Sequence, residues 1–60
     1  MNQSLPNDPI ILLSVINTKL RDRYKDIDEL CQDLSVDKDD LFAKLNNIDY
    51  EYDYKCNQFV

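Results

Sequence analysis

The side chains of this sequence that could do covalent chemistry are two cysteines, Cys31 and Cys56, and twelve carboxylates. A nucleophilic cysteine needs a base, and histidine, the usual base near neutral pH, is absent from the sequence. Glycine is absent too, which excludes the glycine-rich loops that bind phosphate groups. There is no CxxC pair to suggest a zinc site. The sequence therefore predicts a protein that is not an enzyme and holds no cofactor or metal.

The two cysteines have simpler structural interpretations. Cys31 follows Leu30 in an apolar pattern, and a free cysteine often behaves as a small buried hydrophobe. Cys56 lies near the end of the chain, where we expect it to be exposed. A disulfide is not indicated, because no secretory signal precedes this pair. What role either thiol has is left open by the sequence.

The length of 60 residues allows one domain at most. A chain this short buries about 60% of its unfolded surface, so a disulfide, a metal or oligomerisation usually supports it. Oligomerisation is the option left here. The longest apolar segment, residues 10–16, is too short for a spanning helix, which needs about twenty residues. No basic cluster precedes this segment, so we expect a soluble cytoplasmic protein without a signal peptide.

The elements that must position these side chains follow from the turn and cap residues. Residues 1–7 read as a short arm, residues 8–49 as three helices and residues 50–60 as a hairpin or tail. The first helix begins at Asp8-Pro9, since aspartate caps a helix and proline suits its first position. It is expected to run to about Tyr24.

The apolar residues of this first helix separate into two groups at about 100° per residue. The predicted core face is Leu13, Ile16, Leu20 and Tyr24, flanked by Ile10 and Leu12. Ile11 and Val15 fall nearly opposite, on the side that should face water. Either the C-terminal tail covers them or they form a dimer contact, because exposed apolar patches usually have a partner.

The second and third helices have the spacing of a helix-turn-helix. Asp26 with Glu29 resembles a capping box, and Asp37 caps the third helix after a turn at Ser35-Val36. The expected inward residues of the second helix are Ile27, Leu30, Cys31 and Leu34. Those of the third helix are Leu41, Leu45 and Ile48, with Phe42 to one side under the tail.

The end of the chain changes to a period of two. Tyr50, Tyr52 and Tyr54 alternate with acidic residues, which predicts a strand with aromatic side chains on one side. A turn over 53–57 and a return strand over 58–60 complete a hairpin. The predicted fold is mainly α: a three-helix, helix-turn-helix-like bundle followed by a short C-terminal β-hairpin, in the order of a winged helix.

The charge of this bundle opposes DNA binding, which depends on lysine and arginine contacts to phosphate. Residues 26–53 carry ten acidic residues against Lys38 and Lys44, a net charge of −8. The first turn of the third helix, which would approach DNA, is itself acidic. A DNA-binding regulator or accessory factor is therefore the alternative function, and its candidate contacts are Lys38, Lys44 and Asn47.

The basic residues gather at the end of the first helix, where residues 19–25 carry a net charge of +3. They screen the acidic second helix, or they steer self-association or a charged partner. We expect an uncharacterised module that acts by protein–protein contact, as a homodimer or with another protein, and not at a membrane. The candidate interface residues are Ile11, Leu12, Val15, Phe42, Tyr52 and Tyr54.

Three stretches carry a resemblance over essentially the whole chain: Asp8-Pro9 with IILLSVINTKLRD, then DELCQDL, and finally YEYDYKCNQFV. On these residues the chain resembles a family of short bacterial proteins known as domain of unknown function 4250. The resemblance implies a bacterial cytoplasmic origin and brings no activity or site residues with it. One departure is Asp49, where glycine is expected to end the third helix in a left-handed conformation.

Overall fold

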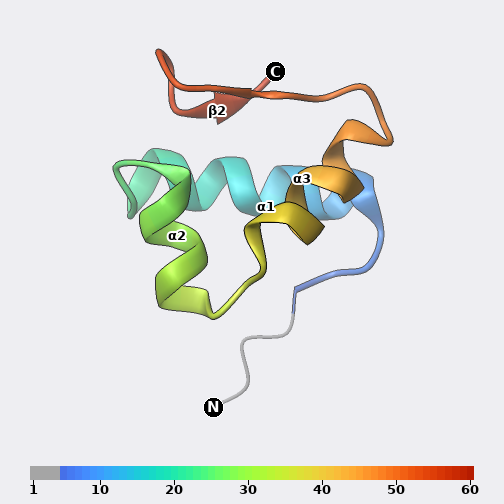
Figure 1. Cartoon of the computed structure of the whole chain (residues 1–60). Helices are drawn as coiled ribbons and strands as arrows, with labels where there is room; N and C mark the ends of the chain where they lie inside the picture. Colours follow the sequence, from blue (N-terminus) through green and yellow to red (C-terminus); the bar gives the residue numbers. More distant parts are fainter. Residues whose placement is uncertain (1–4) are drawn as a thin grey trace.

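The computed structural model describes residues 5–60, and in it three helices precede a two-stranded antiparallel hairpin (Figure 1). The elements are α1 (Pro9–Asp22), α2 (Ile27–Leu34), α3 (Lys38–Asn46), β1 (Tyr52–Asp53) and β2 (Gln58–Phe59). The predicted mainly α fold with a C-terminal hairpin is confirmed, whereas its assignment as a winged helix stays a prediction. Residues 1–4 of the predicted arm lie outside the described residues. Leu5 packs against the core.

Each helix begins at an aspartate whose carboxylate accepts hydrogen bonds from the first-turn N–H groups. These N-caps are Asp8, Asp26 and Asp37, all in extended backbone conformations, as the sequence predicted. Such caps satisfy N–H groups that have no partner within the helix. The expected capping box of α2 is displaced by one residue, because the Glu29 carboxylate accepts from the backbone N–H of Lys25 at 2.9 Å.

Three turns place a residue other than glycine in the left-handed region. They are Ser35 (φ 57°) after α2, Asp49 (φ 67°) after α3 and Asn57 (φ 57°) before β2. Asp49 is the position where glycine is expected to end the third helix. Asparagine and aspartate tolerate this conformation better than most side chains. The chain therefore makes its tight reversals without glycine, at a cost in backbone strain.

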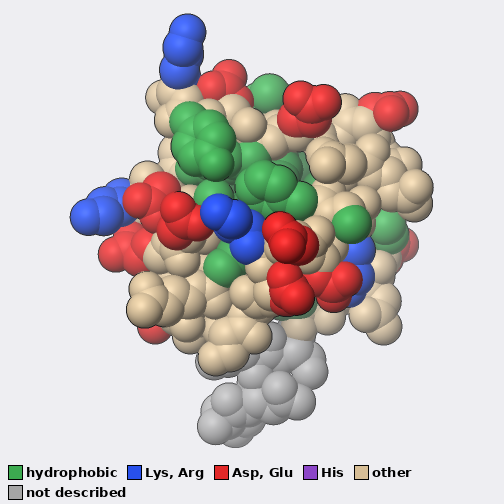
Figure 2. All heavy atoms as spheres, in the orientation of Figure 1, with side chains coloured by type: hydrophobic (Ala, Val, Ile, Leu, Met, Phe, Trp, Pro, Cys, Tyr) green, Lys and Arg blue, Asp and Glu red, His purple; other side chains and the backbone are tan. Residues whose placement is uncertain are grey.

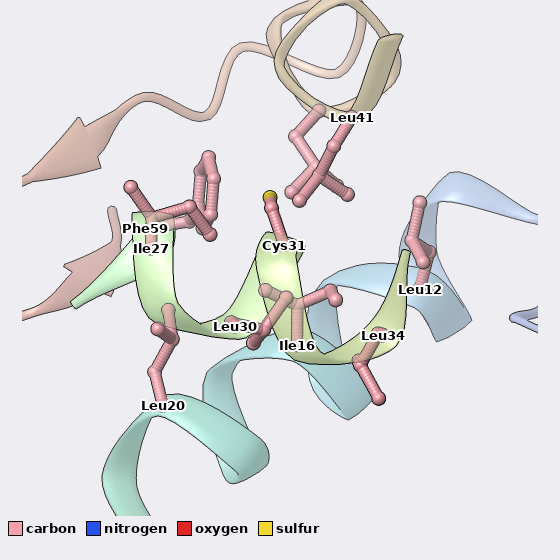
Figure 3. Close-up of a cluster of buried hydrophobic side chains, with 10 residues drawn as sticks. Leu12, Ile16, Leu20, Ile27, Leu30, Cys31, Leu34, Leu41 and Phe59 are labelled. Carbon is pink, nitrogen blue, oxygen red and sulfur yellow. The ribbon is translucent and has the colours of Figure 1, made fainter. Parts of the chain in front are cut away.

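The core lies where α1, α2, α3 and β2 meet, and Figure 3 shows their side chains pointing into one cluster. All four predicted inward residues of α2 are buried, as are Leu41 and Leu45 of α3. The strand β2 contributes Phe59, which is 2% exposed. Among residues 5–60, the buried hydrophobic side chains are Leu12, Ile16, Leu20, Ile27, Leu30, Cys31, Leu34, Leu41, Leu45 and Phe59.

The predicted core face of α1 was wrong in its centre. The buried stripe is Leu12, Ile16 and Leu20, whereas Leu13 is half-buried and Ile10 is 61% exposed. Buried residues do recur every four positions along α1, as predicted. However, α2 and α3 pack on the Leu12 side of Ile16 rather than on the Leu13 side. Helical periodicity gives the width of an apolar stripe, and the neighbouring elements decide its centre.

The hairpin is shorter than predicted and lies along α1 (Figure 1). Tyr52 is opposite Phe59, and Asp53 is opposite Gln58. The backbone hydrogen bonds continue the pairing by one step, from Glu51 to Val60, in both directions. Tyr54 belongs to the turn rather than to the strand, so the expected strand through all three tyrosines was too long.

Candidate functional site

Three of the predicted interface residues are brought together as an aromatic cluster. Phe42 comes from α3, Tyr52 from β1 and Tyr54 from the hairpin turn. The ring centroids of Tyr52 and Tyr54 are 4.6 Å apart, edge to face, and those of Phe42 and Tyr52 are 6.2 Å apart. Phe42 also meets Phe59 edge to face at 5.5 Å. The cluster thus continues from the core to the surface, and Phe42 lies under the tail as expected.

Exposure increases across this cluster from Phe42 outward. Phe42 and Tyr52 are half-buried, and the Tyr54 side chain is 68% exposed. The Tyr52 hydroxyl donates a hydrogen bond to the side-chain oxygen of Asn57, which fixes the ring that Tyr54 packs against. Burial raises the pKa of the Tyr52 phenol, with smaller contributions from the charges of Asp26 and Asp28.

Lys38, the first residue of α3, links this helix to α2. Its Nζ donates to Asp28 Oδ1 at 2.7 Å. The hydrogen bond and charge of Asp28 raise the pKa of Lys38, and the nearby groups of Tyr54 and Cys31 add to this in a smaller way. Both partners of the ion pair are largely exposed, so its contribution to stability is small. Its main effect is to place a neutralised lysine between the two helices.

The face of the molecule shown in Figure 2 combines these features. Hydrophobic side chains gather where α2, α3 and the hairpin meet, and around them lie several acidic side chains and one basic side chain (Figure 2). We call Phe42, Tyr52 and Tyr54 with Asp26 and Asp28 the acidic–aromatic face. An aromatic surface ringed by carboxylates suits a partner that is apolar in the middle and basic at its edge.

The other predicted interface residues lie elsewhere. Leu12 is 1% exposed, so its assignment to an interface was wrong: it packs in the core against α2 and α3. Ile11 is 54% exposed and Val15 is half-buried. The hairpin does not cover Ile11, because it packs on the Asn17 side of α1. Val15 precedes Asn17 by two residues, which puts it about 160° away around the helix.

The alternative DNA contacts do not converge on one basic surface. Lys38 is held by Asp28, while Lys44 and Asn47 are exposed at the opposite end of α3. Asp39 and Asp40 occupy the first turn of this helix beside its aspartate cap. Whether these three residues contact DNA stays a prediction, and the acidic first turn acts against it.

Three amide side chains, none of them among the predicted contact residues, attach the hairpin to α1. The side chain of Asn17 accepts from the N–H of Phe59 at 2.8 Å and donates to its carbonyl at 3.1 Å. Asn57 donates to the carbonyls of Leu20 and Tyr24, at 3.1 and 3.0 Å. Gln58 donates to the Asn17 carbonyl at 3.0 Å. We call Asn17, Asn57 and Gln58 the amide clamp.

One feature of the sequence points to this clamp. Asn17 stands between Ile16 and Leu20 in the middle of a helix, where asparagine is a poor helix former. A polar residue beside a core stripe needs a partner once it is partly buried. That partner is the backbone of a strand 42 residues further along the chain. The periodicity of the first helix alone gives no indication of where such a partner comes from.

A groove runs along α1 beside the hairpin. It has a volume of about 430 Å³ and includes the clamp residues Asn17 and Gln58. Its lining is mixed: Ile10, Leu13 and Tyr50 are apolar or aromatic, and Ser14, Thr18 and Arg21 are polar. We call it the α1 groove. Its open, mixed surface suits a side chain of a partner better than an enclosed substrate.

The environments of the two cysteines differ as predicted. Cys31 is buried in the core and Cys56 is exposed in the hairpin turn. Burial raises the pKa of the Cys31 thiol, and the charge of Lys38 offsets part of this effect. A raised pKa reduces the thiolate population, so Cys31 is poorly suited to nucleophilic chemistry.

Within residues 5–60, no group of three or more cysteine and carboxylate side chains is placed to hold a metal ion. None of the helices in this part of the chain has both the length and the hydropathy needed to cross a lipid bilayer. A family model described as "Domain of unknown function (DUF4250)" matches residues 6–59. No curated protein matches the chain, and no solved structure does either.

Proposed function

The chain belongs to the DUF4250 family, a domain of unknown function, and from the structure we propose that it is a non-enzymatic module that acts by protein–protein contact and associates with itself. The contact surface in this proposal is the acidic–aromatic face. A chain of 60 residues supports this idea in a general way, because such small domains often gain stability from a second copy.

The observation that carries the proposal is the position of Tyr54. Its ring is 68% exposed, yet it stands edge to face on Tyr52, whose hydroxyl is in turn bound by Asn57. An exposed tyrosine that is already fixed loses little side-chain entropy when a partner covers it. Tyrosines of this kind are common among the residues that dominate binding energies. In this proposal the aromatic cluster is therefore a preorganised contact site.

The reactive side chains of the chain support a role without catalysis. The carboxylates of Asp8, Asp26 and Asp37 cap helices, and that of Asp28 holds Lys38. Cys31 is buried with a raised pKa. Each of these four carboxylates already has a structural partner, whereas a catalytic group must be free to meet a substrate.

Sedimentation velocity over a wide range of protein concentration tests the proposal. We expect the unaltered chain to associate as concentration rises and Tyr54→Ser to weaken that association roughly tenfold, as loss of an interface tyrosine does. The matched control is Val60→Ser, which removes an exposed apolar side chain (61% exposed) outside the cluster and should associate like the unaltered chain. A monomer at every concentration would overturn the proposal of self-association.

The alternative function, DNA binding, has one structural feature in its favour. The α2–turn–α3 unit has a helix of eight residues, a left-handed Ser35 and a helix of nine residues, which suits a helix-turn-helix. We expect fluorescence anisotropy with labelled random-sequence duplex DNA at low salt to show no binding. Salt-sensitive binding that is lost when Lys38, Lys44 and Asn47 are all replaced by alanine would establish the alternative instead.

A further inference from the structure

The two strands of the hairpin differ in how the backbone groups at their outer edges are bound. Glu51 and Val60 exchange both of their backbone hydrogen bonds, at 3.0 and 2.8 Å. In the next pair, Tyr52 and Phe59, the N–H and carbonyl groups therefore point away from the partner strand. At β2 the side chain of Asn17 binds both of these groups of Phe59. In the part of the chain that the structure describes, nothing binds those of Tyr52.

The strand with these open groups is also the outer strand of the hairpin. β2 packs against α1 on one side and pairs with β1 on the other. The outer edge of β1 therefore has a free donor and a free acceptor at Tyr52, whereas the edge of β2 has none there. Such an edge binds an extended chain, because the added chain supplies the missing backbone hydrogen bonds.

The side chains along β1 are divided between two faces. Tyr52 packs against Phe42, with ring centroids 6.2 Å apart, so its face continues into the aromatic cluster. Glu51 and Asp53 alternate with Tyr52 and belong to the opposite face. Among the described residues, neither carboxylate is in an ion pair. Asp53 Oδ1 accepts from the backbone N–H of Lys55 at 2.8 Å, and no hydrogen bond is made by the Glu51 carboxylate.

We infer that the outer edge of β1 binds an extended segment of another protein in which lysine or arginine alternates with apolar residues. The segment runs antiparallel to β1, and its backbone binds the N–H and carbonyl of Tyr52. Residues directly opposite each other in antiparallel strands share a face of the sheet. The apolar side chains of the segment thus meet the aromatic cluster, and its basic side chains meet Glu51 and Asp53. This contact is separate from the proposed self-association.

The charges of β1 argue against a second copy of this strand as the partner. Antiparallel pairing of two copies centred on Tyr52 puts Glu51 of each copy opposite Asp53 of the other. Like charges directly opposite each other destabilise a strand pair, whereas opposite charges stabilise it. Charged residues on an edge strand are a common means of preventing pairing between copies. The same two carboxylates that oppose a second copy therefore favour a basic segment.

A synthetic peptide in which valine alternates with lysine over about six residues, a usual strand length, tests the backbone part of this inference. Labelled with fluorescein and titrated with the full chain, it should show saturable binding by anisotropy. Methylation of the valine nitrogens should weaken binding roughly tenfold, because the N–H of the valine opposite Tyr52 donates to its carbonyl. Methylation of the lysine nitrogens is the matched control and should be tolerated, because these N–H groups face away from β1.

Two results would overturn pairing at this edge. One is the absence of binding by the unmethylated peptide at high micromolar protein. The other is that methylation of the valine nitrogens weakens binding no more than methylation of the lysine nitrogens. If the chain stays monomeric but binds the peptide in the expected way, self-association fails and this inference stands. If the chain associates and does not bind the peptide, this inference alone fails.

Glu51→Gln tests the charge part, at an exposed residue where the fold should be retained. It should weaken binding of the unmethylated peptide about threefold, as loss of one cross-strand charge pair does. Asp39→Asn removes the same charge at an exposed residue of α3, outside the hairpin, and should leave the affinity nearly unchanged. Equal losses for the two variants would show that net charge alone attracts the peptide, and the assignment of basic residues to Glu51 would be overturned.

Discussion

The helical bundle and the hairpin of this molecule are held in different ways. The helices meet through apolar side chains such as Leu30 and Leu45, both 0% exposed. The hairpin adds one fully buried residue, Phe59, and the partly buried Tyr50 and Tyr52, and it depends in addition on the hydrogen bonds of the amide clamp. Apolar packing is not directional, whereas each amide needs one particular backbone group. This small fold therefore combines a core that tolerates apolar substitutions with a hairpin attachment that depends on particular atoms.

Leu30→Ala should have the largest effect and tests the bundle side of this comparison. Removing a fully buried leucine costs about 2–5 kcal/mol, which is close to the whole stability of about 3–5 kcal/mol expected for a core of this size. Circular dichroism should show a largely unfolded chain at room temperature. Ile11→Ala is the matched control at a 54% exposed position and should change stability little. A Leu30→Ala protein that stays folded would show that the clamp contributes more than we infer.

Asn17→Ala tests the hairpin side and should destabilise by about 1–3 kcal/mol, because the N–H and carbonyl of Phe59 lose their partner. Amide hydrogen exchange should increase over 51–60 more than within the helices. Asn46→Ala, at an exposed position at the end of α3, provides the control. Equal increases in exchange throughout the chain would mean that hairpin and bundle unfold as one unit, and the comparison would then fail.

Alkaline pH should lower the stability of both the bundle and the hairpin, because each contains a tyrosine with a raised pKa. This loss should be smaller than that caused by Leu30→Ala or Asn17→Ala. The hydrogen bond to Asp33 raises the pKa of Tyr24, and burial raises that of Tyr52. In each case the folded state favours the neutral phenol. The stability that these neutral phenols contribute is fully present below the ordinary phenol pKa of about 10. It is lost as the pH rises through the raised pKa values of the folded state. Urea unfolding at about pH 8 and about pH 11 measures it.

Tyrosine variants separate the two regions in that experiment. Tyr52→Phe should reduce the loss of stability at alkaline pH in the hairpin, since Tyr52 binds the clamp residue Asn57. Tyr24→Phe should reduce it at the junction of α1 and α2, where the hydroxyl donates to Asp33. If neither variant changes the pH dependence, another group is responsible for it.

The smallest changes in stability are expected from glycine substitutions at the left-handed turns. One of these substitutions should stabilise the protein and the other should destabilise it. Ser35→Gly should stabilise the bundle by about 0.5–1 kcal/mol, because glycine adopts φ 57° without the steric cost of a side chain. Asn57→Gly has the same backbone advantage but removes the clamp bonds to α1. Thermal unfolding should therefore move in opposite directions for the two variants. A stabilising Asn57→Gly would show that the clamp bonds contribute little.

The bundle was predictable from the sequence because its determinants are local. Asp8, Asp26 and Asp37 cap helices through N–H groups two or three residues away, and the apolar residues of α2 repeat within one helix. The left-handed position of Asp49 could likewise be read from its place after a helix. The centre of the α1 stripe could not, because it depends on where α2 and α3 pack.

The site was predictable in part. The sequence named Phe42, Tyr52 and Tyr54 as contact residues, and the fold does bring them together. Leu12 was misassigned because its place at the edge of the apolar stripe did not show which flank α2 and α3 would cover. The amide clamp joins residues about forty positions apart, and no periodicity contains that information.

The pairing of Asn17 with Phe59 also limits how copies of this chain can aggregate. A short sheet has an outer edge where unpaired N–H and carbonyl groups can recruit a strand from another chain. At β2 both of these Phe59 groups are already bound by the asparagine side chain, which takes the place of a neighbouring strand. This edge is therefore closed to amyloid-like growth.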